Sequence, residues 1–305
     1  MWSAAAAALP RLPVDSGLLE PDRQADLRIL VIGDDTRRPS ASSPVVTAGR
    51  ADSISVWVVR HGKTRVLAVP RDLRVHVPGR GDQKLSGTLD YGASATVAAV
   101  DQLLDIRISH VVDVDFAGFQ RAVDVLGGID LKIRAAIRDP TVGLQLDPGP
   151  QHLDGSTALA YVRARTPEVL LNGTWRTAAG DLGRLTRQQQ VATAMLTSIR
   201  GQSPMWTVAH AGALAGAGLR VDAGMDAELV QRIGGSLASS NVAFCLLPTR
   251  WQVPDTEATS PFDGSRPGSV NYRVLAPDAG VALDWLVGPG GIPPPDACAS
   301  PVEDG

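Results

Sequence analysis

The chain has 305 residues, of which 44% are hydrophobic and 20% are charged, and it carries a formal net charge of −3. This composition describes a globular chain with room for one large domain or two small ones. A slightly acidic balance without a long basic run argues against a general nucleic-acid binder. No stretch reaches the roughly 20 consecutive apolar residues that a membrane-spanning helix needs.

The hydrophobic pattern alternates between the periods of strands and helices along the chain. Strands are predicted, in order, at 27–33, 53–59, 64–70, 110–116, 129–133, 242–248 and 270–275. Helices are predicted near 93–104, 117–126, 155–161, 183–200, 226–238 and 278–287. This order predicts an α/β fold, a three-layer αβα domain at 27–290 with a mixed central sheet. Tails are expected at 1–26 and 291–305.

Polar residues gather at one edge of this predicted sheet. If the strands at 27–33, 53–59 and 64–70 form an antiparallel meander, the end of the first, the start of the second and the end of the third meet. These points carry Asp35, Arg50, Asp52, Arg71 and Asp72. Carboxylates beside arginines suit a site in which a hard divalent cation and guanidinium forks share a phosphate. The alternative is that the aspartates only cap turns.

Two arginines, Arg163 and Arg165, follow an apolar run in the stretch AYVRARTPEV. A spacing of two residues matches one face of a strand, so an extended backbone would direct both guanidinium groups the same way. On a helix they would diverge by about 200°. Two parallel arginines repel each other unless an anion lies between them. The alternative is a pair of solvated surface charges.

The predicted helix at 183–200 carries polar residues on its apolar stripe. Val191, Met195 and Ile199 mark the inward face, and Arg184 and Gln188 continue that stripe towards the N-terminus. A helix N-terminus favours anions, and burying an arginine without a partner is costly. This end of the helix is therefore expected to face a negative group, either a ligand or a core carboxylate.

Other common catalytic signatures are missing from the sequence. It contains no Gly-rich phosphate loop ending in Lys-Ser or Lys-Thr and no Gly-x-Ser-x-Gly elbow, and its five histidines have no metal-binding spacing. Acid–base chemistry would fall to carboxylates and charge stabilisation to arginines. The two cysteines, Cys245 and Cys298, are too few for a zinc site. They form either one disulfide, which needs an oxidising compartment, or two separate thiols.

Seven short motifs follow one another over roughly residues 27–200. They read LRILVIGDDTRR, RADS, AVPRD, QKLSGTLDYG, DFAGFQRAVDVLGGIDL, LDPGPQHLDGSTALAYVRAR and GDLGRLTRQQQ. The series resembles the LytR-CpsA-Psr (LCP) family of bacterial cell envelopes. That resemblance implies a phosphotransferase that moves a glycopolymer from a polyprenyl-pyrophosphate carrier to peptidoglycan. Such an enzyme would act at the extracytoplasmic face of the cell membrane, and its lipid substrate would bring it to the membrane surface.

The resemblance also implies roles for individual residues. Carried over by motif, Asp35 and Asp52 would hold Mg²⁺, and the catalytic residues would be Asp52, Arg71, Arg163 and Arg165. The pyrophosphate would be bound by Arg50, Arg71, Lys84, Arg163, Arg165, Arg184 and Gln188. A polyprenyl chain also requires an apolar tunnel. We expect its lining to come from the helices near 93–104 and 117–126 and from the inner face of the sheet.

Two features depart from the pattern of the family. Its members normally carry an N-terminal membrane anchor, of which residues 1–26 are expected to be at most a remnant. The stretch between Arg165 and Asp181 is longer than usual and is a surface insertion, a lid or an acceptor loop. Two other functions remain open from the residues. One is a pyrophosphatase that uses the same arginines with water as acceptor, and the other is a non-catalytic polyprenyl-lipid-binding protein.

Overall fold

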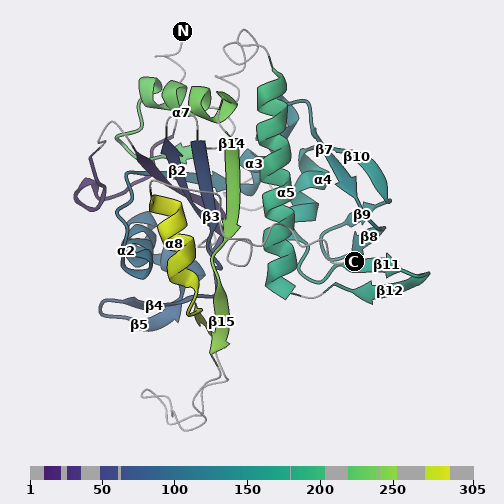
Figure 1. The fold of residues 1–305 in the computed structure, drawn as a ribbon, viewed down its shortest axis with the longest axis horizontal. Helices are drawn as coiled ribbons and strands as arrows, with labels where there is room; N and C mark the ends of the chain where they lie inside the picture. The colour runs from purple at the N-terminus through teal and green to yellow at the C-terminus, as the bar shows by residue number, and fades with distance from the viewer. Residues whose placement is uncertain are drawn as a thin grey trace, which may run out of the picture.

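A six-stranded mixed sheet forms the centre of the molecule (Figure 1). The structure, a computed structural model, describes residues 10–21, 26–35, 49–60, 63–178, 180–202, 219–239, 241–252 and 272–288. The strand order is β13-β6-β1-β2-β3-β14. In that order the strands span Leu219–Val221, His110–Asp115, Leu27–Asp34, Ala51–Arg60, Lys63–Ala68 and Asn241–Leu246.

The predicted antiparallel meander is confirmed by the strand pairing. β2 pairs antiparallel with both β1 and β3, while β6 runs parallel to β1 and β14 runs parallel to β3. The end of β1, the start of β2 and the end of β3 therefore lie at one edge of the sheet. We call this edge the polar edge.

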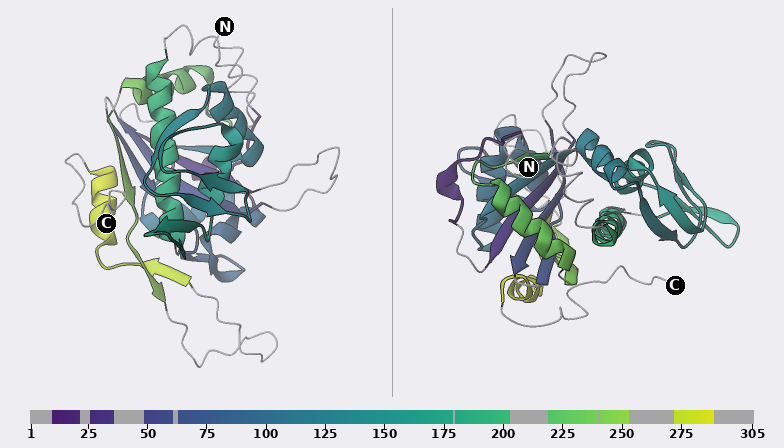
Figure 2. Two further views of the ribbon diagram at one scale, coloured as in Figure 1. Left: turned by 90° about the vertical axis from the view of Figure 1, so that its right-hand side faces the viewer. Right: turned by 90° about the horizontal axis from the view of Figure 1, so that it is seen from above.

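Helices cover both faces of the sheet, as the predicted αβα architecture requires (Figure 2). One face packs against the 3₁₀ helix η2 (Leu85–Tyr91), α2 (Ala93–Leu104) and α8 (Ala279–Val287) in a core that joins Val56 of β2 to Val97 and Leu286. The other face packs against α7 (Ala227–Ser239), where Ile29 and Val59 meet Leu229, and α5 (Gly180–Gly201) contacts β14 there. Alternating side chains of the strands supply both layers.

A β-rich arm lies on the far side of α5 from the central sheet. β7 (Ile129–Ile133) pairs with β10 (Gly149–Leu153). A second sheet, of order β12-β11-β8-β9, is made of Thr174–Thr177, Glu168–Leu171, Ile137–Asp139 and Leu144–Leu146. Only β7 was predicted, from its alternating Ile129, Leu131 and Ile133. The other strands of the arm have three to five residues and too few apolar positions for a clear period. The long stretch after Arg165 forms the β11–β12 hairpin, which turns at Asn172 and Gly173 with positive φ.

Two small hairpins flank the polar edge. β4 (Arg74–Val77) pairs with β5 (Gly81–Lys84), and β15 (Thr249–Gln252) pairs with β16 (Tyr272–Leu275). A single bridge between Leu73 and Arg273 joins the two hairpins. The first hairpin thus begins just after β3, and its end at Lys84 returns to Asp72, close to the end of β3.

Two capped helices lie beside the arm and pack against each other. Asp115 accepts a hydrogen bond from the backbone N of Gly118 at 2.6 Å and begins α3 (Phe116–Val125). Asp154 accepts one from the backbone N of Thr157 at 2.8 Å and begins α4 (Gly155–Arg163), and this bond lowers the pKa of Asp154. Each cap satisfies a donor that the first helical turn leaves unpaired.

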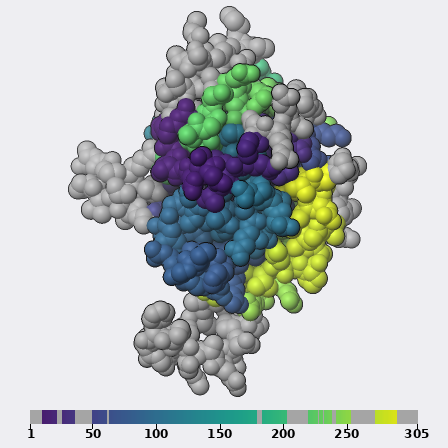
Figure 3. Space-filling view, turned by 90° about the vertical axis from the view of Figure 1, so that its left-hand side faces the viewer, coloured from purple at the N-terminus to yellow at the C-terminus, as the bar shows by residue number. Residues whose placement is uncertain are grey.

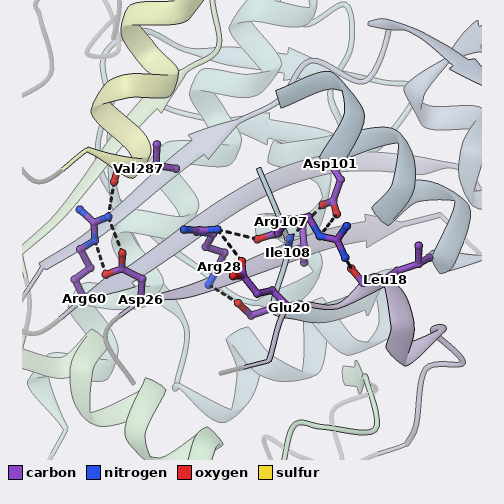
Figure 4. A network of polar contacts seen from close by, with 10 residues as sticks. Leu18, Glu20, Asp26, Arg28, Arg60, Asp101, Arg107, Ile108 and Val287 are labelled. Atoms are coloured by element: carbon purple, nitrogen blue, oxygen red, sulfur yellow. Dashed lines mark hydrogen bonds and ion pairs between the residues drawn. The ribbon is translucent and has the colours of Figure 1, made fainter. Parts of the chain in front are cut away.

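Residues 10–21, which the sequence suggested as part of a tail, pack on the fold and include the 3₁₀ helix η1 (Ser16–Leu18) (Figure 3). Leu12 is buried in the core of the α2 face, and its N donates to the carbonyl of Val221 at 2.8 Å. Figure 4 shows the polar contacts that hold this segment at the sheet end opposite the polar edge, among them Arg28 with Glu20 at 3.0 Å. In this network burial raises the pKa of Asp101 to about 6.

A buried ionic cluster joins three strands of the sheet. Arg220 of β13 contacts Asp34 of β1 at 2.5 Å and Asp113 of β6 at 2.5 Å, and both aspartates are fully buried. Burial and the neighbouring Asp34 raise the pKa of Asp113 to about 7. The cluster fixes the end of β1 immediately before Asp35.

Among the described residues, the helices are all too short or too polar to span a lipid bilayer.

The substitution Gly155→Ala should destabilise the fold. A Cβ at this position would lie 2.2 Å from the carbonyl oxygen of Gln120 in α3, so α3 and α4 would have to separate. We expect a loss of roughly 1–3 kcal/mol in the free energy of unfolding. The control is Gly280→Ala in α8, where a Cβ would meet no described atom within 4 Å and should stabilise by about 0.5–1 kcal/mol. Denaturant unfolding measures both, and equal stability of the two variants would contradict the close approach.

The substitution Asp113→Asn should flatten the dependence of stability on pH. Because the pKa of Asp113 rises from 3.8 to about 7 on folding, the folded state holds the proton more tightly. The associated stability is complete below the unfolded pKa and is lost as the pH rises through about 7. Between about pH 5 and pH 8 the wild type should lose roughly 1–3 kcal/mol more than the variant. Asp90→Asn, at an exposed position of η2, should keep the wild-type profile in the same denaturation series.

Candidate active site

The polar edge presents Asp52 in an irregular part of the sheet. Gly33 pairs with Ser53 and Asp34 pairs with Ala51, so Asp52 is the extra residue of a β-bulge. A bulge takes one residue out of the ladder and re-aims its side chain. The carboxylate of Asp52 is thereby turned to side chains from outside the sheet.

Two arginines from distant parts of the chain meet at Asp52. Arg71, just after β3, places Nη1 at 2.5 Å from Oδ1 of Asp52, and Arg165, just after α4, places Nη2 at 3.1 Å from the same oxygen. The side chains of Asp52 and Arg71 are each 16% exposed, while that of Arg165 is 54% exposed. One carboxylate thus holds two guanidinium groups together at the rim of the site.

Asp72 forms a second ion pair beside the first. Its Oδ1 lies 2.7 Å from Nζ of Lys84 at the end of β5, and its Oδ2 lies 3.8 Å from Nε of Arg71. Asp72 is buried, and Lys84 is partly exposed. The β4–β5 hairpin therefore brings Lys84 back to the point where the chain left β3. Arg71 contacts both aspartates and links the two ion pairs.

Asp35 and Arg50 lie opposite each other beyond the paired ends of β1 and β2. The backbone N of Arg50 donates to Oδ1 of Asp35 at 2.6 Å, and the backbone N of Asp35 donates to the carbonyl of Arg50 at 3.1 Å. The residues predicted to converge at this edge, Asp35, Arg50, Asp52, Arg71 and Asp72, are therefore gathered at one edge of the sheet. Their proposed roles toward a ligand stay predictions.

The expectation that Arg163 and Arg165 share one strand face is wrong. Arg163 is the last residue of α4, which runs two residues further than predicted, and Ala164 turns the chain out of the helix with ψ 118°. The guanidinium of Arg163 stacks on the ring of Phe116 at 4.4 Å from its centroid, while Arg165 reaches Asp52. The two arginines thus approach the polar edge from different directions, because the helix end and not a strand separates them.

Helix α5 brings its first turns to the same edge. Arg184 is 3% exposed, in agreement with its place on the apolar stripe. Gln188, one turn later, lines a cavity of about 70 Å³ between α5 and the sheet, together with Ser53, Trp57, Val66 and Phe244. Its Oε1 is buried and has no hydrogen-bond partner among the described residues.

This cavity is lined by the sheet, as was predicted for the lipid tunnel, but not by the two predicted helices. Its described walls come from α5 and from β2, β3 and β14, and neither α2 nor α3 contributes to them. Val97, Val100 and Leu104 of α2 are buried in the core on the opposite face of the sheet. The side of the sheet that a helix covers depends on tertiary packing, which the period of its apolar residues does not report.

Arg187 was missed by the sequence reasoning. It is 7% exposed, and its Nε donates to the carbonyl of Tyr161 at 3.1 Å, while its Nη2 donates to the carbonyl of Ala164. Burial lowers the pKa of this guanidinium. Arg187 thus ties α5 to the end of α4, where carbonyl groups lack helical partners. Its position three residues after Arg184, on the same side of the helix, was the available signal.

The carboxylates of the site suit a metal only in combination with a ligand. Among the described residues, no three His, Cys, Asp or Glu side chains form a metal-binding group. Asp35 and Asp52 supply two carboxylates, and Mg²⁺ in proteins commonly takes one or two carboxylates together with substrate phosphates and water. The donor chemistry therefore fits Mg²⁺ when a phosphate is also present.

Comparison with known proteins places the chain in a family. Residues 12–260 match the sequence profile of the LytR_cpsA_psr family. The chain is 32% identical over 211 residues to a polyisoprenyl-teichoic acid–peptidoglycan teichoic acid transferase, TagU, of Halalkalibacterium halodurans, covering 67% of this chain and 63% of the relative. It is 30% identical over 179 residues to the probable cell wall biosynthesis protein LcpB of Corynebacterium glutamicum, covering 55% of this chain and 41% of that protein.

The fold is shared with solved structures over most of the chain. The LytR-Csp2A-Psr enzyme from Actinomyces oris superposes with a TM-score of 0.69 at 24% identity, over 95% of this chain and 96% of that one. A structure described as TagT bound to LI-WTA has a TM-score of 0.62 at 22% identity, over 90% and 92%. The chain spans 41% to 63% of the length of the two curated relatives described above. It belongs to the LytR-CpsA-Psr family.

Proposed function

We propose that the chain transfers a glycopolymer from a polyprenyl-pyrophosphate carrier to peptidoglycan. The observation that carries this proposal is the linked pair of ion pairs at the polar edge, in which Asp52 holds Arg71 and Arg165 and Asp72 holds Lys84. Three cations held within reach of one another suit a pyrophosphate, which offers several charged oxygens. The names of the curated relatives, which include polyisoprenyl-teichoic acid–peptidoglycan teichoic acid transferases, support the same reaction.

The proposed reaction is a single displacement at phosphorus. A hydroxyl oxygen of the acceptor attacks the phosphorus that bears the glycopolymer, and the bond from this phosphorus to the bridging oxygen breaks. Polyprenyl phosphate leaves. The proton of the attacking hydroxyl passes to this departing phosphate, so charge is balanced. Such a transfer depends mainly on positioning and charge neutralisation. Arg71 and Arg165 supply planar forks for the phosphate oxygens, and Arg163, Arg184 and Gln188 complete the predicted clamp together with Arg50 and Lys84.

Asp35 and Asp52 would hold Mg²⁺ in this proposal. When bound, the ion would neutralise charge on the pyrophosphate oxygens. Asp52 also accepts two guanidinium groups and limits the repulsion between them. The same carboxylate thus keeps both arginines at the polar edge.

The cavity between α5 and the sheet is the proposed entrance for the lipid. Its walls include Trp57, Val66 and Phe244, and Gln188 connects it to the predicted clamp. At about 70 Å³ it is smaller than ligand sites of about 300–1,000 Å³, so a polyprenyl chain requires α5 to move away from β3 and β14.

The extracytoplasmic location remains part of the proposal. Cys245 is buried in β14 and is disulfide-bonded. The other cysteine, Cys298, lies outside the described residues. A disulfide is typical of an oxidising compartment, such as the outer side of a bacterial membrane.

Two other functions use the same cluster and are separated by their products. A pyrophosphatase would release the glycopolymer phosphate into water, and a lipid-binding protein would bind the carrier without turnover. Incubation of unlabelled peptidoglycan with a lipid-pyrophosphate donor that carries a label in its glycopolymer decides among them. Covalent labelling of the peptidoglycan supports the transferase, and donor cleavage without labelling supports the pyrophosphatase.

Replacing Arg165 by Lys should slow transfer by about 10²–10³, because lysine keeps the charge but loses the fork that holds developing charge on phosphate oxygens. Arg163→Lys should have a similar effect. Arg121→Lys, at an exposed position of α3, is the matched control and should stay within a factor of about two. Steady-state kinetics measure turnover of the donor, and a melting curve checks that each variant is folded. Wild-type turnover in both variants would exclude the clamp.

Replacing Asp52 by Ala should lower turnover by a factor of at least about 10² and abolish its response to Mg²⁺, while the protein remains folded. The control is Asp82→Asn, which removes an exposed partner of Arg74 in the β4–β5 hairpin and should leave turnover unchanged. Turnover is measured across a magnesium titration and in excess chelator. Full activity of the wild type in chelator would remove the metal from the proposal.

A further inference from the structure

A second cleft lies on the other side of α5, between this helix and β7 of the arm. Its volume is about 640 Å³, and its described walls include Gln189, Gln190, Thr193 and Thr197 of α5 and Asp130 and Lys132 of β7. This volume is within the range of about 300–1,000 Å³ found for ligand sites. Figure 1 shows α5 between the central sheet and the strands of the arm, so the cleft faces away from the proposed lipid entrance.

Most residues that line this cleft are polar, and together they have little net charge. The helix contributes amides and hydroxyls, and the strand contributes one carboxylate and one ammonium group. Anion recognition normally uses arginine forks, and the described lining contains no arginine. The chemistry therefore fits an uncharged ligand rich in hydroxyl and amide groups.

The hydrogen bonds within the wall prepare it for such a ligand. Thr193 and Thr197 donate their hydroxyl hydrogens at 2.9 Å to the carbonyls of Gln189 and Thr193 one turn earlier. Their oxygens therefore face the ligand as acceptors. The hydroxyl of Tyr161 donates to Oε1 of Gln190 at 2.8 Å and fixes the orientation of that amide, whose NH₂ group is a donor.

The cleft adjoins the predicted clamp. Gln189 follows Gln188 in the chain and lines both the cleft and the lipid-side cavity. From Gln189 to Ser198 the helix rises by about 14 Å, which is long enough for a few sugar units. A polymeric ligand lying in this cleft would run along α5 and end beside the proposed site of transfer.

We infer that this cleft binds the glycan strand of the acceptor, an uncharged N-acetylated polysaccharide, and directs one of its hydroxyls to the polar edge. The inference rests on the proposed function, because it identifies the acceptor for that transfer. The competing ligand is the peptide part of peptidoglycan. A peptide would add to the outer edge of β7 through backbone hydrogen bonds. The amides and hydroxyls of α5 favour the glycan, since a peptide paired with β7 would not require them.

The test uses the full chain and a soluble β-1,4-linked N-acetylglucosamine oligomer as the probe. Thr193→Val combined with Thr197→Val removes two acceptors at exposed positions without changing their shape. It should weaken binding of the oligomer by about tenfold or more, as expected for lost hydrogen bonds. Thr193→Phe should block the cleft altogether. Gln102→Phe, at an exposed position of α2 on the other side of the sheet, controls for added surface bulk and should bind like the wild type.

Three outcomes would overturn the inference. The wild type could fail to bind the oligomer, the double valine variant could bind it as tightly as the wild type, or a stem peptide alone could bind and be blocked only by Thr193→Phe. Binding of polyprenyl phosphate is measured in parallel and should be unchanged in all three variants. Oligomer binding in a protein without transferase turnover would remove the proposed function and leave the cleft assignment standing. Turnover without oligomer binding would support the proposed function and remove the cleft assignment.

Discussion

The site depends on one constraint: several positively charged side chains must be held close together at one edge of the sheet. Arg71 and Arg165 come within reach of a single carboxylate oxygen of Asp52, and Lys84 comes within reach of Asp72. Without these carboxylates the cations would repel one another, and partial burial would increase that cost. The aspartates therefore hold the cations in the arrangement that, in the proposed function, a pyrophosphate would use.

The surrounding structure works to keep these charges together. The β-bulge re-aims Asp52, the buried cluster of Arg220 with Asp34 and Asp113 fixes the end of β1, and Arg187 ties α5 to the end of α4. Each of these features holds a polar group in one orientation. Ionic groups of this kind hold a geometry more than they stabilise a fold, because desolvation offsets much of their attraction.

Helix α5 lies between two cavities. Leu185, Gln188 and Ala192 line the cavity at the sheet, and Thr193 and Thr197 line the cleft at the arm. In the proposed function, the lipid carrier would lie on the sheet side of this helix and the glycan on the arm side. In Figure 2 the helix is seen end-on between the central body and the arm. The proposed donor and acceptor could thus meet at its N-terminal end without sharing a binding surface.

The sequence by itself determined the elements whose apolar period is long, namely the meander β1–β3, the helices and the gathering of Asp35, Asp52 and Arg71 at one edge. Those features follow from local pattern and from the geometry of antiparallel strands. Only the tertiary structure decided the short strands of the arm, the separation of Arg163 from Arg165, the face of the sheet on which α2 lies and the role of Arg187. These depend on contacts between residues far apart in the chain. A local period specifies which side of an element is buried but not the partner that buries it.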